Sequence, residues 1–259
     1  MSKASQPVKD YMTAPVHTVG PSDDLSSVYK LLIELEISSV PVIENGNSLV
    51  GVISMTDLLK VGRHRAGSQR DAALLELPNS EVYEYMSAVV VTVTPDDPVA
   101  LAAERMVEGR FHRVFVIDGN KHVGVVSTRD VMSAVRDKGM NSPISDWMSS
   151  PALTIRAEEP IAMATDRLRR AHVTGLIVVE DGWPVGLFTQ SEALQSGALP
   201  RDTRVDVVMN AAMLVLDEST RLHRAAAQAA ALRVRRVIAV RSRKVAGILT
   251  GFDFARAAI

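Results

Sequence analysis

The chain has 259 residues, of which 47% are hydrophobic and 23% charged, and its formal net charge is −1. This composition is typical of a soluble globular protein with ample core material, and the absence of cysteine excludes disulfides, thiolate metal sites and cysteine nucleophiles. No apolar run approaches the ~18 to 20 residues that span a bilayer, so we expect a cytoplasmic protein that does not enter a membrane.

Two landmarks recur along the chain at nearly the same intervals. Glycines open the segments GVISMTD, GVVSTRD, GLFTQSE and GILTGFD at residues 51, 124, 186 and 247, which are 73, 62 and 61 residues apart. Methionines at 12, 86, 148 and 209 are 74, 62 and 61 residues apart. Because both landmarks keep the same step, the sequence predicts four repeats.

The order of elements is predicted from the first repeat. A β-branched pair at Thr18 and Val19 indicates a short strand, and apolar residues at helical spacing predict a helix over 25–35. The apolar segment SVPVIE, a turn at Gly46 and a second strand lead to Gly51, and the glycine motif begins another helix. Each repeat is therefore expected to be an α/β unit of the form β-α-β-β-α.

The later repeats follow the same pattern. In TPDDP, Thr94 is expected to be the N-cap of a helix with Asp97 three residues on, and Pro160 is expected in the first turn of the next one. The interval between repeats one and two holds about 12 extra residues within 62–81, which we interpret as a surface linker or an extended helix.

A repeat of about 60 residues buries too little surface to be stable alone, so pairs are expected. The first pair, 1–140, is predicted to contain repeats at about 8–62 and 80–139. The second pair, 141–259, is predicted to contain repeats at about 142–197 and 202–259.

The fourfold pattern and the closing motif G-h-h-(S/T)-x-x-D resemble CBS domains, arranged as two tandem pairs over nearly the whole chain. This arrangement is similar to that of the gamma subunit of AMP-activated kinase. The resemblance implies AMP, ADP, ATP or a related adenosyl compound as ligand, bound in clefts between paired repeats. It also implies a regulatory protein acting on a separate target protein, as a monomeric disc of four repeats or a homodimer. We expect no enzymatic activity, because no catalytic motif and no metal-ligand spacing of histidines is found.

The motif also has a direct chemical interpretation. A carboxylate at the start of a helix can accept hydrogen bonds from both hydroxyls of a ribose, and a hydroxyl three residues earlier can meet a phosphate at the helix N-terminus. These positions are held by Asp57, Asp130 and Asp253, and by Ser54, Ser127 and Thr250, with Thr56 and Arg129 inside the motifs. Glu192 departs from the pattern, which puts the third site in doubt.

The resemblance adds candidates for the phosphate. Kinase gamma subunits carry His-Arg before a strand to bind phosphate, and here His112-Arg113 and Arg235-Arg236 occupy that place. Repeats one and three have Ser38-Ser39 and Thr174-Gly175 instead, so each pair is expected to hold one phosphate environment.

Two alternatives to nucleotide sensing remain open. Each motif acid has the position of an ordinary helix-capping residue, so the sites could be vestigial and the repeats could serve as a dimerisation or docking scaffold. Residues 221–244 carry eight basic side chains and no acidic one, which would fit nucleic acid. An aromatic content of 4% argues against base stacking, so nucleic acid is ranked last.

Overall fold

The computed structural model describes residues 6–35, 37–45, 48–64, 75–119, 121–197 and 199–259. The chain divides into two compact units, Met1–Ser127 and Thr128–Ile259. This boundary comes earlier than residue 140, where the first pair was expected to end. The reason is that helix α4 (Thr128–Lys138) packs on helices of the second unit, α7 (Leu222–Ala231) and α8 (Gly251–Ala258).

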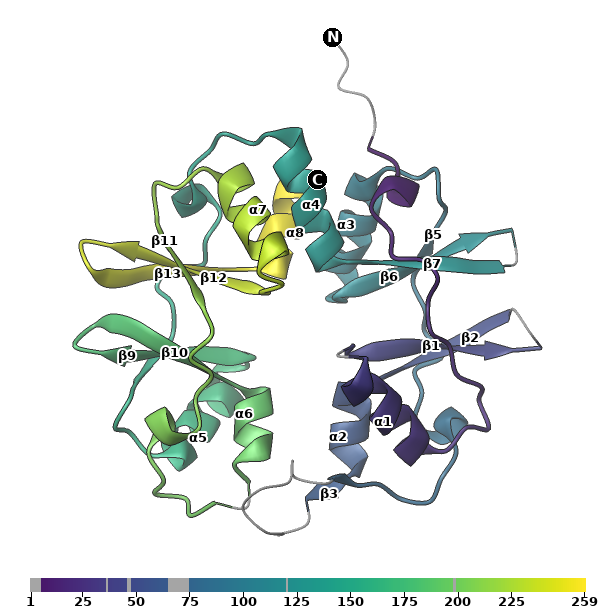
Figure 1. Cartoon of the computed structure of the whole chain (residues 1–259), viewed down its shortest axis with the longest axis horizontal. Helices are drawn as coiled ribbons and strands as arrows, with labels where there is room; N and C mark the ends of the chain where they lie inside the picture. The colour runs from purple at the N-terminus through teal and green to yellow at the C-terminus, as the bar shows by residue number, and fades with distance from the viewer. Residues whose placement is uncertain (1–5, 36, 46–47, 65–74, 120, 198) are drawn as a thin grey trace. The chain divides into compact units, whose positions relative to one another are not determined.

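The first two repeats share the expected order of α and β elements (Figure 1). The first has a 3-10 turn η1 (Val8–Asp10), then α1 (Leu25–Glu34), β1 (Ser39–Glu44), β2 (Ser48–Ser54) and α2 (Met55–Val61). The second has η2 (Val82–Glu84), β5 (Thr92–Val93), α3 (Val99–Gly109), β6 (Arg113–Asp118) and β7 (Lys121–Ser127), followed by α4.

The last two repeats have the same order of elements. The third has η3 (Ile144–Asp146), β8 (Thr154–Arg156), α5 (Ile161–Ala171), β9 (Gly175–Glu180), β10 (Trp183–Thr189) and α6 (Gln190–Gln195). The fourth has η4 (Val205–Val207), β11 (Leu214–Asp217), then α7, β12 (Arg236–Arg241), β13 (Lys244–Thr250) and α8. The mixed α/β repeat predicted from the sequence is confirmed.

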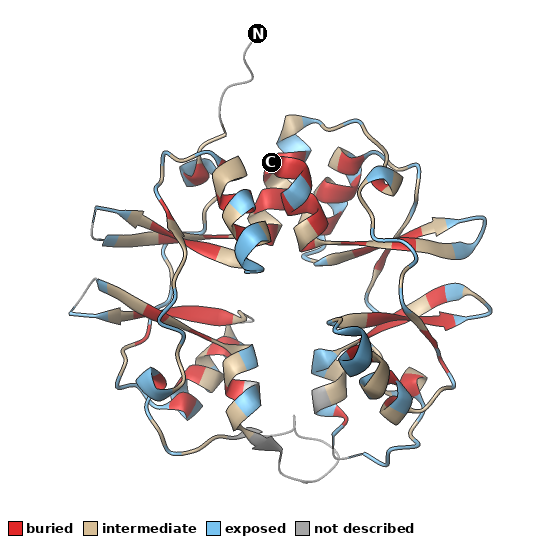
Figure 2. Ribbon diagram, turned by 180° about the vertical axis from the view of Figure 1, so that it is seen from behind, coloured by how far each residue is buried: buried red, intermediate tan, exposed pale blue. Residues whose placement is uncertain are grey.

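In repeats two to four the first strand pairs in parallel with the second strand, which forms an antiparallel hairpin with the third. In repeat one the first strand is a single parallel bridge between Val19 and Val42. Apolar positions of the first helix cover this hairpin: Leu25, Val28 and Leu32 are buried together with strand residues of β1 and β2. Figure 2 shows buried residues on the strands and on one side of the helices.

Two sequence expectations about helix starts are corrected. Helix α3 begins at Val99 with Pro98 as its N-cap, so Thr94 is not the cap. Instead, the carboxylate of Asp97 accepts a hydrogen bond from the backbone N–H of Thr94 at 2.7 Å and closes the turn before the helix. Pro160 is likewise the N-cap of α5 rather than a first-turn residue. In both cases the proline takes extended backbone angles that end the preceding turn.

The interval between repeats one and two is only partly described. Residues 65–74 of the expected linker, like Gly46 in the first hairpin, lie outside the described residues. At the ends of that interval, β3 (Arg63–His64) pairs antiparallel with β4 (Leu75–Glu76), so the described ends form a short ribbon rather than a helix.

The two sequence landmarks meet each other across paired repeats. A Cβ atom placed on Gly51 would lie 2.6 Å from the sulfur of Met86, and one on Gly124 would lie 2.7 Å from the sulfur of Met12. The residue after each methionine bridges the partner hairpin, as Thr13 does with Val125. The second unit repeats the exchange with Gly186 and Met209, and with Gly247 and Met148. Glycine and methionine therefore recur together because each repeat inserts its methionine against its partner's glycine.

Candidate functional site

The motif acids occupy the third residue of the helix that directly follows the hairpin, as the sequence predicts. In repeat four, Oδ2 of Asp253 accepts hydrogen bonds from the backbone N–H of Thr250 at 2.6 Å and from its hydroxyl at 2.8 Å. Asp57 forms the corresponding capping box with Ser54. The capping role that the sequence left open is therefore present, and any contact with a sugar would be made in addition to it.

The second carboxylate oxygen has a cationic partner in repeats one and four. Oδ1 of Asp57 lies 3.3 Å from Nζ of Lys60, and Oδ1 of Asp253 is bonded by the guanidinium of Arg256. The Asp57 side chain keeps 25% of its surface exposed, whereas that of Asp253 keeps 4%. A diol ligand at either acid would have to share this oxygen with the cation or displace it.

The other two motif acids are placed in the same way. Asp130 is half-buried on α4, directly after Thr128 and Arg129. In repeat three, Glu192 accepts a hydrogen bond from the backbone N–H of Thr189 at 2.8 Å, so the longer side chain still caps its helix. The departure from aspartate thus preserves the local cap.

In each unit one arginine crosses to the partner repeat. Arg113, at the start of β6, donates to the backbone carbonyl of Ser39 at 3.2 Å and to the hydroxyl of Ser38 in repeat one. Arg236, at the start of β12, donates to the hydroxyl of Thr174 at 2.9 Å in repeat three. The positions that lack arginine in the odd repeats are therefore the positions that the arginines of the even repeats contact.

Gly175 belongs to this arrangement. A Cβ atom at Gly175 would lie 3.4 Å from Nε of Arg236, so a larger residue would crowd the guanidinium. The sequence shows Thr174-Gly175 only as a missing arginine. Thr174 accepts a hydrogen bond from Arg236, and Gly175 leaves room for its guanidinium group. Both contacts form only when the two repeats pack together, so no local pattern in the sequence reveals them.

The second unit gathers three guanidinium groups. Desolvation, and then repulsion from Arg129 and Arg236, lower the pKa of Arg235 from its ordinary value. Desolvation also lowers the pKa of Arg236, and the carboxylate of Glu192 partly opposes this. Among the described residues, Nε of Arg129 is buried and has no hydrogen-bond acceptor. Cations held near one another form an environment that favours an anion. We call Arg129, Arg235 and Arg236 the arginine cluster.

The arginine cluster differs from the grouping expected from the sequence. Arg129 belongs to the motif of repeat two, yet it lies near Arg235 of repeat four. Two other candidates, His112 and Thr56, are exposed.

Two arginines that the sequence analysis did not single out support the first strand of their repeats. Arg105 on α3 donates to the carbonyl of Thr92, and Arg167 on α5 donates to that of Thr154 at 2.6 Å. Each arginine lies 13 residues after its threonine, and this repeated spacing is the sequence feature that could have predicted the contact. Next to this contact in repeat two lies an open hollow lined by Val91, Thr92, Arg105, Glu108 and Gly109.

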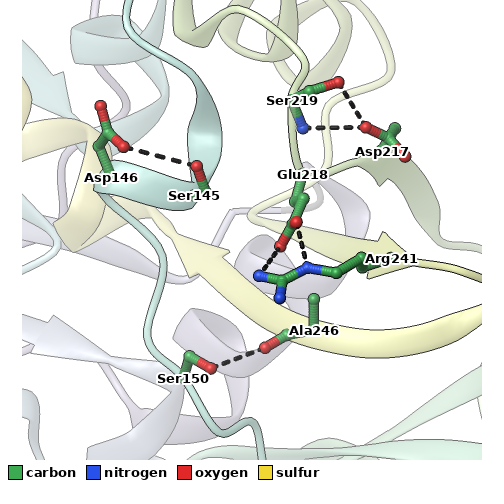
Figure 3. A network of polar contacts seen from close by, with 8 residues as sticks. All are labelled: Ser145, Asp146, Ser150, Asp217, Glu218, Ser219, Arg241 and Ala246. Carbon is green, nitrogen blue, oxygen red and sulfur yellow. Dashed lines mark hydrogen bonds and ion pairs between the residues drawn. The ribbon is translucent and has the colours of Figure 1, made fainter.

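The basic segment 221–244 does not present a uniform cationic surface. The guanidinium of Arg241 forms a two-pronged ion pair with Glu218, with Nη2 at 2.7 Å from Oε2 (Figure 3). Arg221 donates to the carbonyl of Asn141 at 2.6 Å, and Arg236 belongs to the arginine cluster. Several basic side chains of this segment thus already interact with other groups of the second unit.

None of the described helices has the length and apolar character needed to cross a bilayer. In the part of the chain that the structure describes, no three His, Asp or Glu side chains are grouped as a metal ion would require.

Comparison with known proteins identifies the repeats. A sequence model of the CBS domain matches residues 8–64, 82–137 and 144–198. The fourth repeat lies outside these matches, although its elements follow the same order.

Curated relatives include two archaeal proteins without an assigned role. An uncharacterized protein of Methanocaldococcus jannaschii is 25% identical over 271 residues, covering 96% of this chain and 61% of that protein. An uncharacterized 33.4 kDa protein of Thermofilum pendens is 24% identical over 202 residues, covering 73% of this chain and 63% of that protein. The chain thus spans less than two thirds of the length of both.

Solved structures share the fold. A Methanocaldococcus jannaschii protein, proposed to be an archaeal homologue of g-AMPK, aligns with a TM-score of 0.75 at 20% identity, over 98% of this chain and 100% of that one. A conserved protein of Pyrococcus horikoshii aligns with a TM-score of 0.71 at 20% identity, over the same shares. CBSX2, solved in complex with AMP, matches 52% of this chain and 98% of its own, at 25% identity and a TM-score of 0.43.

Proposed function

Because the chain belongs to the CBS-domain family, we propose that it is a regulatory protein that binds an adenine nucleotide and acts on a separate partner protein. The observation that carries this proposal is the arginine cluster of the second unit. Arg129 and Arg236 both repel Arg235, and the carboxylate of Glu192 acts on Arg236, so positive charge is concentrated here. A phosphate group, with a charge of about −1.5 to −2, would neutralise part of this charge.

Each candidate residue has a role in this proposal. Carboxylates at the starts of the motif helices accept from ribose hydroxyls, and hydroxyls and backbone N–H groups at the same turn meet the phosphate. In this proposal the sugar is held by Asp57, Asp130 and Asp253, with Ser54, Thr56, Ser127 and Thr250 beside them. A phosphate in the first unit is held by His112 and Arg113, and one in the second unit by Arg129, Arg235 and Arg236. AMP, ADP and ATP all present the required groups.

Nucleotide binding is tested by thermal unfolding with adenosine, AMP, ADP and ATP, on protein from which co-purified nucleotide has been removed. A ligand at one hundred times its Kd should add about 2.7 kcal/mol to the free energy of unfolding. Mass spectrometry of small molecules released from the denatured protein identifies the ligand that it carries. A chain that is stabilised by none of the four and that releases no adenosyl compound contradicts the proposal.

A second prediction concerns the arginine cluster: one substitution there should preserve or raise stability and weaken AMP binding. Arg235→Gln removes a cation that is repelled by Arg129 and Arg236, so the ligand-free chain should unfold at the same or a higher temperature. The same change should weaken AMP binding about tenfold or more, because a charge-assisted hydrogen bond to phosphate is lost. Adenosine binding should not change. Calorimetric titration with both ligands measures the difference.

A scaffold without ligand is the second candidate, and the capping boxes favour it. Both carboxylate oxygens of Asp253 are engaged by Thr250 and Arg256, which gives this acid a structural role that needs no ligand. The scaffold predicts that Asp130→Ala leaves every nucleotide titration unchanged. The regulatory proposal predicts weaker binding, so this variant decides between the two.

A further inference from the structure

The motif helices of repeats two and four touch at their first residues. Thr128 begins α4 and is 4% exposed, and Gly251 begins α8 and is buried. A Cβ atom at Gly251 would lie 2.5 Å from the hydroxyl oxygen of Thr128 and 2.7 Å from its Cβ atom. Such distances do not occur between real side chains, so only glycine permits this contact.

The contact continues along both helices. At the other end of α4, Nζ of Lys138 donates to the carbonyl of Ala258, the last residue of α8, at 3.3 Å. The first residues of α4 and α8 lie together, and so do their last residues. The two helices therefore run parallel and side by side (Figure 1). Both helices carry fully buried apolar residues, among them Val131 and Val135 on α4 and Phe254 and Ala255 on α8. Close packing of this kind transmits displacement because it leaves no room for independent movement.

Each motif acid is tied to this contact within its own helix. Asp253 caps Thr250, the residue directly before Gly251. Asp130 stands two residues after Thr128 in α4. Arg129 of repeat two also lies close enough to Arg235 of repeat four to lower its pKa. A ligand held at one acid therefore acts on a helix start that is packed against the other helix start.

We propose that repeats two and four bind their ligands cooperatively and that the contact between Thr128 and Gly251 transmits the effect. This inference rests on the proposed nucleotide binding. A ligand that orders the start of one helix also orders the start of the helix packed against it, so the second ligand has less ordering left to do. Linkage requires the effect to be reciprocal.

Hydrogen exchange in the full chain tests the inference with AMP as the probe. In the Asp253→Asn variant, which weakens the motif of repeat four while keeping its shape, AMP bound through Asp130 should slow amide exchange in α4. It should also slow exchange in α8 by about threefold or more. In Asp130→Asn/Asp253→Asn the slowing in α8 should disappear. If it persists there, AMP contacts α8 directly and the inference is wrong.

The contact itself is tested by exchanging its two residues. Gly251→Ala, added to Asp253→Asn, places a methyl group against Thr128 and should abolish the slowing in α8. Adding Thr128→Gly as well moves the small residue to the other helix, relieves the clash and should restore the slowing. Thermal unfolding shows which variants are folded. If Gly251→Ala is not, the exchanged variant still decides the matter, since absence of slowing there contradicts the inference.

The two proposals fail in different ways. If AMP slows exchange in α4 but not in α8 of the Asp253→Asn variant, nucleotide binding stands and only the coupling is overturned. If none of AMP, ADP and ATP slows exchange anywhere in the unaltered chain, the proposed function falls and the coupling falls with it.

Discussion

His122 is a polar side chain placed where its repeat partners have apolar ones. It directly precedes the bulge in β7 and pairs with Ile117, and the corresponding residues of repeats one and four are Leu49 and Val245. Its Nε2 atom is buried without a hydrogen-bond partner among the described residues. Its ring lies 5.7 Å from that of Phe115. Burial lowers the pKa of His122 below its ordinary value of 6.5, and the backbone of Gly124 partly offsets this effect.

A neutral imidazole in the folded state makes stability depend on pH. Because the unfolded chain binds the proton more readily, the free energy of unfolding should fall as the pH decreases below about 6.5. His122→Val, which copies Val245, should remove this share of the pH dependence. It should also stabilise the chain by on the order of 1 kcal/mol at pH 5, since no unpaired polar atom is then buried. Urea unfolding at pH 5 and pH 8 measures both effects.

The exposed His17 provides the control for this prediction. His17→Val should leave the difference between the two pH values as it is in the unaltered chain. An unchanged pH dependence in His122→Val would show that another group is responsible.

At the scale of the elements, the hairpins are shaped by the glycine of each motif. The register of every hairpin shifts next to this glycine, for example between Val116 and Ile117, where Gly124 pairs with Val116. A glycine at a bulge permits the close approach of another backbone segment. That segment comes from the paired repeat and carries the methionine. The bulge and glycine of one repeat thus accommodate the methionine of its partner, and each repeat of a pair plays both parts.

Alanine at these glycines should destabilise the pairs unequally. A Cβ atom at Gly247 would lie 2.8 Å from the backbone oxygen of Ser149, whereas one at Gly124 would lie 3.2 Å from that of Thr13. A methionine side chain can move away, but backbone cannot, so Gly247→Ala should be the more costly change. We expect losses of about 1–3 kcal/mol, with Gly247→Ala at the upper end.

Shortening the methionine separates the two sources of the clash. Adding Met12→Ala to Gly124→Ala should cost less than the sum of the single changes, because the sulfur at 2.7 Å is removed. Adding Met148→Ala to Gly247→Ala should rescue less, because Ser149 remains. Chemical denaturation of the six variants measures this. Equal rescue at both positions would show that the backbone contact is not limiting.

At the scale of the whole molecule, positive and negative charges are nearly equal in number, but they are unevenly distributed along the chain. The net charge of −1 gives no long-range attraction for a polyanion. The arginine cluster and the ion pair of Arg241 with Glu218 show that the basic segment 221–244 is divided between a local anion-favouring environment and internal pairing. This distribution fits a small anion better than a nucleic acid.

We therefore expect weak binding to DNA. At physiological salt, a labelled duplex should bind with a Kd no tighter than about 10⁻⁴ M, at the weak end of the range for non-specific binding. Fluorescence anisotropy measures this affinity. AMP serves as the positive control in a parallel titration, and tight, strongly salt-dependent binding of the duplex would restore the nucleic-acid alternative.

The number of repeats, their α/β order and the place of the motif acids could all be predicted from the chain. These features are local or periodic: an acid three residues after a hydroxyl, or apolar residues at helical spacing, leaves a pattern in the chain. Where two local patterns compete, the sequence was less reliable. The TPDDP segment predicts a helix cap at Thr94, whereas Pro98 decides where α3 begins.

Only the tertiary structure decided which repeats share residues. It paired Gly124 with Met12, led Arg236 to Thr174, and placed Arg129 of repeat two beside Arg235 of repeat four. These contacts join residues far apart in the chain. Their formation depends on which faces of the repeats pack together, and packing of distant surfaces leaves no periodic trace in the sequence of either partner.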